Sequence, residues 1–263
     1  MLRVAEGIGR SVVRGAEEVG FASALFVESL LWAIFGPARR QPVRLPAVVT
    51  QMMQIGVGAL PIATVLAATI GLMLAIQSLY SLSLFGAESF ATAGIALAVV
   101  REFAPLIIAI LIAGRSGSAL AARFSTMMIN QEVDALKVMG ISPVRFLVAP
   151  SLIAMMVMVP ALTMWAILVA LTAGGLFVTA SLQLSMAAYF ADVIAILSVN
   201  DLMHGLGKSV LFAALVALVS AVNGALADGG AEGVGQRTTR AVVQSIAAII
   251  MVDMIFAFIV TSG

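Results

Sequence analysis

Five long apolar segments constrain the fold of this chain more than any other feature. Each is near or above the roughly 20 residues that a helix needs to cross the hydrocarbon core of a bilayer. The segments cover residues 55–79, 93–113, 146–178, 210–227 and 241–260. Because backbone polar groups in lipid must be satisfied within the chain, these segments predict transmembrane helices. The expected fold class is an all-α integral membrane protein with five spans.

The composition agrees with a lipid environment. Of the 263 residues, 62% are hydrophobic and 10% charged, whereas a soluble domain has roughly 45–50% apolar and about 25% charged residues. The net charge of +1 supplies no concentrated basic face, so we expect no nucleic-acid partner. With no cysteine and a single histidine, His204, we expect no disulfide, metal site or cofactor in this chain.

Residues 1–48 are interpreted as an N-terminal helical segment that precedes a membrane domain over residues 49–263. Residues 1–19 predict an amphipathic helix in the plane of the interface. Its apolar face carries Ala5, Ile8, Val12, Ala16 and Val19, and its charged face carries Arg3, Glu6, Arg10, Arg14 and Glu17. Residues 19–36 are almost wholly apolar, but Glu28 and the flanking basic residues favour an interfacial or re-entrant helix over a span. A signal peptide fits less well, because the segment lies far inside the chain without a clear cleavage site.

The distribution of basic residues predicts the orientation of the spans. Lys and Arg stand before the first span, between the second and third spans, and before the fifth. The connections 81–92 and 179–203 contain neither residue type. Because basic residues of short loops stay on the cytoplasmic side, we expect a cytoplasmic N-terminus and a C-terminus on the opposite side.

A short amphipathic helix is predicted at about residues 130–140, between the second and third spans. Val133, Leu136 and Met139 share one side, Glu132, Asp134 and Lys137 point elsewhere, and Gly140 with Pro143 ends the helix. One interpretation is a solvated loop helix on the membrane surface. The other is a coupling helix that docks into a cytoplasmic motor and transmits its rigid-body movement to the spans.

Several motifs, in this order, resemble the MlaE (YrbE) permease family. They are EFAPL at 102–106, AGRSGSA at 113–119, QEVDALKVMGISPVR at 131–145, HGLGKSVLF at 204–212 and GGAEGVGQRTTRAVV at 229–243. The resemblance covers about residues 50–260, and several ordered motifs are more specific than any one of them. One departure is Arg123-Phe124, where the family pattern has an acidic residue and a small aliphatic stretch.

The resemblance implies the permease subunit of an ATP-driven lipid transporter. It implies a homodimer in the cell inner membrane of a diderm bacterium, two cytoplasmic ABC ATPase subunits, a periplasmic MCE-domain ring and a STAS-domain protein on the ATPases. The cargo would be phospholipid or a similar lipid moved between inner and outer membranes, which maintains outer-membrane lipid asymmetry. The chain itself would not be an enzyme: ATP and Mg would bind the ATPase, and the chain has no phosphate-binding G-x-x-x-x-G-K-[ST] loop. The coupling helix would act through Glu132, Asp134, Leu136, Met139 and Gly140.

Four ionisable residues fall within or at the edge of the spans: Arg101, Glu102, Lys208 and Asp253. A charge in mid-bilayer costs about 2.5–3.5 kcal/mol on insertion scales, so these residues should find partners. They could simply lock the helices in register. The alternative hypothesis is that Glu102, Lys208 and Asp253 line or gate the lipid pathway, while Arg101 meets a lipid headgroup or Glu88.

Tyr80, Leu82 and Phe85 follow the first span and could hold acyl chains in a dimer cavity, although such residues often form an aromatic belt. Two other function classes stay open. The chain could be an ion-coupled secondary carrier that uses Glu102 and Asp253, or a non-transporting anchor for a periplasmic lipid-binding complex.

Overall fold

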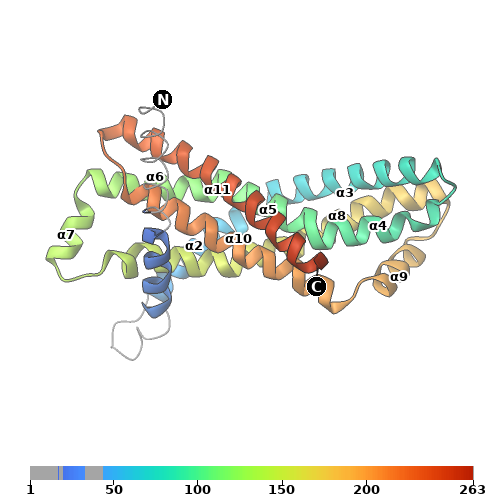
Figure 1. Ribbon diagram of the computed structural model, residues 1–263, viewed down its shortest axis with the longest axis horizontal. Coiled ribbons are helices and arrows are strands. Elements are labelled where there is room, and N and C mark those ends of the chain that lie inside the picture. Colours follow the sequence, from blue (N-terminus) through green and yellow to red (C-terminus); the bar gives the residue numbers. More distant parts are fainter. Residues whose placement is uncertain (1–16, 18–19, 33–43, 263) are drawn as a thin grey trace. The chain divides into compact units, whose positions relative to one another are not determined.

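The computed structural model describes residues 17, 20–32 and 44–262, and the side chains of these up to residue 259. The described part folds into helices (Figure 1). The amphipathic helix expected over residues 1–19 lies outside the described residues, apart from Glu17. Residues Gly20–Trp32 form an apolar helix shorter than a membrane span.

Five helical stretches are long and apolar enough to cross a membrane, which confirms the predicted all-α architecture with five spans. They are Leu45–Ser83, Glu88–Ile129, Val144–Leu182, Val199–Ala225 and Gly230–Ile259. Each extends beyond its apolar segment at one or both ends, because helices continue past the hydrocarbon core into the polar region. By length and composition, the chain is a multi-pass membrane protein.

Most stretches are built from several helical elements in succession. The first contains α2 (Leu45–Ile55), η1 (Val57–Ala59) and α3 (Leu60–Ser83). The second contains η2 (Glu88–Phe90), α4 (Ala91–Ala98), η3 (Val99–Phe103), α5 (Ala104–Ile112), η4 (Ala113–Gly117) and α6 (Ser118–Ile129). There follow α7 (Glu132–Val138), η5 (Val144–Val148), α8 (Ala149–Leu182), α9 (Met186–Ile196), α10 (Val199–Ala225) and α11 (Gly230–Ser262).

Three of these elements, η3, η4 and η5, are single turns of π-helix; η3 and η4 lie inside the second stretch, and η5 begins the third. Two of them lie two residues before a proline: η3 before Pro105 and η5 before Pro150. Proline lacks the N–H that would close the regular helical hydrogen bond and its ring crowds the carbonyl four residues earlier. A π-turn at that point widens the helix locally and is a frequent device at functional sites.

The contacts divide the chain into two compact units, each described here by itself. The first unit comprises Met1–Gln51, Ala113–Ala154 and Ala214–Ser245. The second unit comprises Met52–Ile112, Met155–Ala213 and Ile246–Gly263.

Small residues bring the helices of the second unit close together. A Cβ atom on Gly71 of α3 would lie 2.0 Å from the carbonyl oxygen of Ala170 in α8. Tyr189 of α9 is fully buried and packs over Gly175 of α8, where a Cβ atom would lie 2.6 Å from the ring. The α3 helix lies beside α4 and α8, and α9 lies next to α4 (Figure 1). This packing is typical of membrane helices, in which small residues permit close backbone approach.

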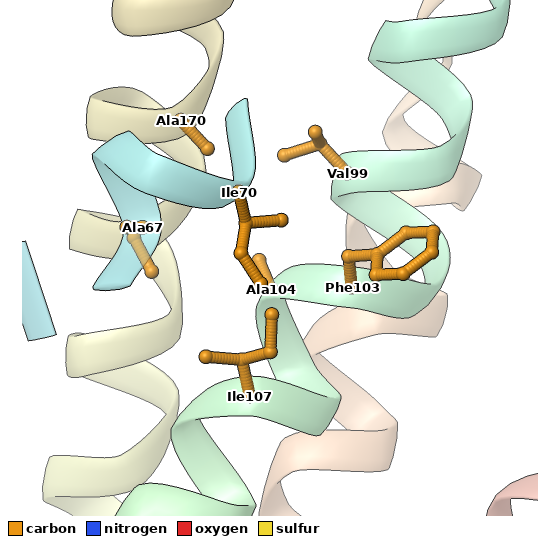
Figure 2. A pocket seen from close by; sticks show the side chains of 8 residues that line it. Ala67, Ile70, Val99, Phe103, Ala104, Ile107 and Ala170 are labelled. Atoms are coloured by element: carbon orange, nitrogen blue, oxygen red, sulfur yellow. The ribbon is translucent and has the colours of Figure 1, made fainter. Parts of the chain in front are cut away.

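An apolar hollow in the second unit shows how tight this packing is. Figure 2 shows Ile70 of α3, Val99 and Phe103 of η3 and Ile107 of α5 around it. Its volume is about 10 Å³, which is no more than the space of a single water molecule. The hollow is therefore a packing defect rather than a binding site.

In the first unit, α7 is a short helix closed by a Schellman motif. The N–H of Gly140 donates to the carbonyl of Lys137, and the N–H of Ile141 donates to the carbonyl of Leu136, both at 2.9 Å. Gly140 has a φ of +72°, a conformation that glycine adopts without strain. The expected helix at about residues 130–140 is thus present, and Gly140 is the residue that ends it.

Candidate functional site

An ion cluster of Glu102, Lys208 and Asp253 lies in the second unit. The Lys208 ammonium donates to both carboxylate oxygens of Glu102, with Nζ to Oε1 and Oε2 distances of 2.7 and 2.6 Å. Its Nζ also lies 2.9 Å from Oδ1 of Asp253, as an ion pair without hydrogen-bond geometry. Two carboxylates that are distant in the sequence thus contact one ammonium. Such pairing is expected because an isolated charge in lipid is costly.

The three members of the ion cluster differ in accessibility. The side chain of Lys208 is 3% exposed and that of Asp253 16%, whereas the side chain of Glu102 is 41% exposed. Lys208 also lies over the ring of Phe256, with Nζ 5.4 Å from the ring centroid, a distance that allows a cation–π interaction. The buried ammonium therefore holds the cluster together, and Glu102 is the member that a ligand could reach.

Close packing between α10 and η3 positions Lys208 against Glu102. Gly205 lies one turn before Lys208 on α10, and a Cβ atom there would come within 2.2 Å of the carbonyl oxygen of Val100. A residue with a side chain would push α10 away from η3. On the other side, the π-turn η3 presents Arg101 and Glu102 in succession, ahead of Pro105. The absence of a side chain at Gly205 and the widened turn together set the geometry of the cluster.

A second ion pair, Arg101–Asp201, lies in the same unit. Nε of Arg101 donates to Oδ1 of Asp201 at 2.5 Å, and the guanidinium forms a salt bridge with the same carboxylate. The partner of Arg101 within the described residues is therefore Asp201 and not Glu88. The side chain of Arg101 remains 44% exposed, so its guanidinium can still meet an anionic group.

Asp201 was missed as a site residue because the sequence places it in a connection between spans. Its signal is a capping box, Ser198-x-x-Asp201, just before an apolar run. In the structure the N–H and hydroxyl of Ser198 donate to Oδ2 of Asp201, and the N–H of Asp201 donates back to Oγ of Ser198. One carboxylate thus starts α10 and also holds Arg101.

The five charged groups carry one more negative charge than positive charge. Among the described residues, Arg101 neutralises Asp201, while Lys208 faces both Glu102 and Asp253. A low-dielectric surrounding makes an unbalanced carboxylate costly. The arrangement therefore suits a cationic ligand group at the exposed Glu102.

The other predicted site residues occupy different places. Tyr80 and Leu82 lie at the end of α3 and Phe85 lies in the turn that follows; Tyr80 and Phe85 are exposed and Leu82 is half-buried. In α7, Glu132 and Asp134 are exposed, and Asp134 pairs with Lys137 at 2.9 Å. Their roles in lipid contact and in coupling remain predictions.

The apolar side of α7 differs from the expected one. Val133 and Leu136 are each only 8% exposed and pack within the chain, whereas Val138 is 89% and Met139 63% exposed. The helix α7 ends at Val138, and Met139 is its C-cap. The helical spacing that would put Met139 on the same side as Leu136 therefore does not apply. The apolar surface available to a partner is Val138–Met139, not Leu136.

The family model of the permease MlaE matches residues 48–259. The chain belongs to the MlaE permease family. It is 31% identical over 245 residues to a probable ABC transporter permease protein of Rickettsia felis, covering 93% of both chains. It is 33% identical to a probable ABC transporter permease protein of Synechocystis sp., covering 81% of both.

A further relative is a chloroplastic plant protein. The chloroplastic protein TRIGALACTOSYLDIACYLGLYCEROL 1 of Arabidopsis thaliana is 30% identical over 207 residues, which cover 79% of this chain and 59% of the plant protein. Membership in the MlaE family makes this chain a transporter permease. The ion cluster lies in three parts of the matched region, on η3, α10 and α11.

Proposed function

We propose that this MlaE permease is the membrane subunit of an ATP-driven transporter that moves phospholipid between the inner and outer membranes and maintains outer-membrane lipid asymmetry. The observation that carries the proposal is the family match over residues 48–259. Relatives named as probable ABC transporter permeases support an ATP-driven mechanism. The plant relative, whose name is that of a galactolipid, supports a lipid cargo.

In the proposed assembly, lipid passage and ATP hydrolysis belong to different subunits. Two copies of this chain form a homodimer in the inner membrane, with cytoplasmic ABC ATPase subunits that bind ATP and Mg. A periplasmic MCE-domain ring receives or delivers the lipid, and a STAS-domain protein binds the ATPases. The alternation of basic and acidic connections supports a cytoplasmic N-terminus and a periplasmic C-terminus, which puts α7 on the ATPase side.

The ion cluster is proposed to gate or line the lipid pathway. Glu102 is the accessible member, and Arg101 lies next to it on the same π-turn with a half-exposed guanidinium. Adjacent groups of opposite charge suit the phosphate and amine of a lipid headgroup. Tyr80, Leu82 and Phe85 are proposed to contact acyl chains, because they present apolar and aromatic surface at the end of α3.

Copurification tests the ATP-driven function. A tagged copy of this chain, extracted in mild detergent, should retain a nucleotide-hydrolysing subunit and phospholipids that mass spectrometry identifies. An ion-coupled carrier would instead purify without an ATPase and transport in response to an ion gradient. A non-transporting anchor would keep its cellular phenotype when the ATPase is made inactive. Either result would contradict the proposal.

A further inference from the structure

A cavity of about 370 Å³ lies in the first unit, next to α7. It is lined by residues of the Gly20–Trp32 helix, α6, α7, the segment 142–148 and the end of α10. Its apolar wall includes Phe21, Leu25, Phe124, Met128, Val133 and Leu147. Its volume falls within the range of about 300–1,000 Å³ that is typical of ligand pockets. The cavity shares no residue with the ion cluster.

Three polar residues, Glu28, Lys137 and Ser142, also line the cavity. Oε1 of Glu28 accepts hydrogen bonds from the hydroxyl of Ser142 and from the indole N–H of Trp32, both at 3.2 Å. These bonds fix the carboxylate between the Gly20–Trp32 helix and the residues that follow α7. Lys137 pairs with Asp134, but its side chain remains 58% exposed, so its ammonium can also meet a second anion.

We propose that this cavity binds a zwitterionic phospholipid with a primary amine in its headgroup, one acyl chain lying against the apolar wall. The lipid ammonium pairs with Glu28 and the lipid phosphate with Lys137. A zwitterion matches both charges of the wall, whereas an anionic lipid would bring no cationic group to the Glu28 carboxylate. An uncharged apolar molecule would cover both charged groups and offer neither of them a partner of opposite charge.

Bound lipid would act directly on α7, because Val133 and Lys137 belong both to the cavity wall and to α7. An acyl chain packed against Val133 adds apolar contact to a helix of only 7 residues, which has little stability of its own. The lipid therefore orders α7. The binding step needs neither ATP nor a partner, so it can hold or fail independently of the proposed transport function.

The test uses the full chain in nanodiscs that contain phosphatidylethanolamine with a photoreactive acyl chain, and phosphatidylglycerol with the same chain for comparison. After illumination, mass spectrometry maps the labelled peptides. We expect labelling of the α6 and 142–148 segments by phosphatidylethanolamine, and about tenfold less by phosphatidylglycerol, since one charge-assisted hydrogen bond is lost. Hydrogen exchange of the α7 amides should slow when phosphatidylethanolamine is present.

Two variants and one matched control complete the test. Ala225→Trp fills the cavity from the end of α10 and should abolish the labelling, whereas Ala227→Trp, two residues further at a half-buried position outside the wall, should not. Glu28→Gln keeps the size of the side chain and should remove the preference for phosphatidylethanolamine. Equal labelling by both lipids in the unaltered chain, or unchanged labelling in Ala225→Trp, would overturn the proposal. So would a cavity occupied by residues 1–19 of the chain itself, seen as crosslinks between peptides.

Discussion

Lys208 Nζ and Glu102 Oε2 lie 2.6 Å apart, although 106 residues separate them in the sequence. This contact joins α10 to the π-turn η3, and the same ammonium reaches Asp253 on α11. The side chain of Lys208 is nearly inaccessible, so the pair is both a structural link and the candidate centre of the lipid pathway. The two roles can be separated by experiment.

Replacement of Lys208 by Met should destabilise the second unit by about 3–5 kcal/mol, because it leaves two carboxylates without their cation. The triple variant Lys208→Met, Glu102→Gln, Asp253→Asn removes all three charges and should regain most of that loss. Thermal unfolding in detergent measures both variants. If the ion cluster gates lipid, the triple variant should assemble normally and fail to support outer-membrane barrier function. Full barrier function in the triple variant would show that the cluster only holds helices together.

Replacement of Gly205 by Ala should separate α10 from η3. The added Cβ atom would meet the carbonyl oxygen of Val100 at 2.2 Å, and such overpacking costs about 1–3 kcal/mol. Gly207 is the matched control on the same helix, since a Cβ atom there meets nothing within 4 Å. Gly207→Ala should be neutral or stabilise by up to about 1 kcal/mol through helix propensity. Equal unfolding temperatures for the two variants would contradict the packing described here.

Replacement of Asp201 by Asn separates the two functions of that carboxylate. An Asn side chain can still accept from Ser198 and start α10, but it removes the negative charge that faces Arg101. Because the Arg101 side chain is 44% exposed, the loss of stability should be about 1 kcal/mol or less. Circular dichroism and thermal unfolding check this expectation. A loss comparable to that of Lys208→Met would mean that the pair carries more of the fold than its exposure indicates.

The stability of the folded chain should depend on pH in the alkaline range because of Tyr189. Burial raises the pKa of Tyr189 from 10.0 to about 12, so the folded state holds the phenol proton more tightly than the unfolded state. The stability gained this way is complete below pH 10 and is lost as the pH rises from 10 to about 12. Tyr189→Phe should remove this alkaline loss. It should cost little at neutral pH, because the buried hydroxyl has no hydrogen-bond partner within the described residues.

The chain supplies its own control for this titration. Its only other tyrosine, Tyr80, is 65% exposed, so Tyr80→Phe should leave the alkaline loss in place. Unfolding temperatures measured at about pH 9 and about pH 11 compare the three proteins. If the stability of Tyr189→Phe still falls between these two pH values, the fall is caused by groups other than Tyr189.

The exposed end of α7 should determine binding of the ATPase. Val138→Asp with Met139→Asp changes two exposed apolar residues, so the unfolding temperature should stay the same while the copurified ATPase is lost. Leu136→Asp would place a charge in the chain's own core and should unfold α7. Leu184→Asp, in the connection between α8 and α9, is the matched surface control and should retain the ATPase. Retention of the ATPase by the double variant would remove Val138 and Met139 from the docking surface.

The sequence predicts the spans well because lipid imposes a strong and local rule. A run of about 20 apolar residues has few alternatives to a transmembrane helix, and all five runs became long helices. The same rule brought Glu102, Lys208 and Asp253 together, since isolated charges are costly in lipid. The features predicted best are those for which a lipid environment permits only one structure: helical spans and paired charges.

Details that depend on hydrogen-bond register were not predictable from the sequence. Two of the three π-turns precede a proline, which removes a donor, but η4 does not. Pro160 lies inside the continuous helix α8, so a proline alone does not identify a π-turn. The inward position of Leu136 and the outward position of Met139 depend on where α7 ends. Asp201 looked like a residue of a polar connection, because Asn200, Asp201 and His204 lower the local hydropathy of what proves to be the first turns of α10.

Transfer of fluorescent phospholipid by the reconstituted complex tests the central claim most directly. The complex copurified with this chain is placed in proteoliposomes, and lipid movement to an acceptor is recorded with ATP, without ATP, and with an imposed ion gradient. We predict movement that requires ATP hydrolysis and falls to background in the triple variant that neutralises Lys208, Glu102 and Asp253. Movement that proceeds without ATP, or that follows the ion gradient instead, would contradict the account.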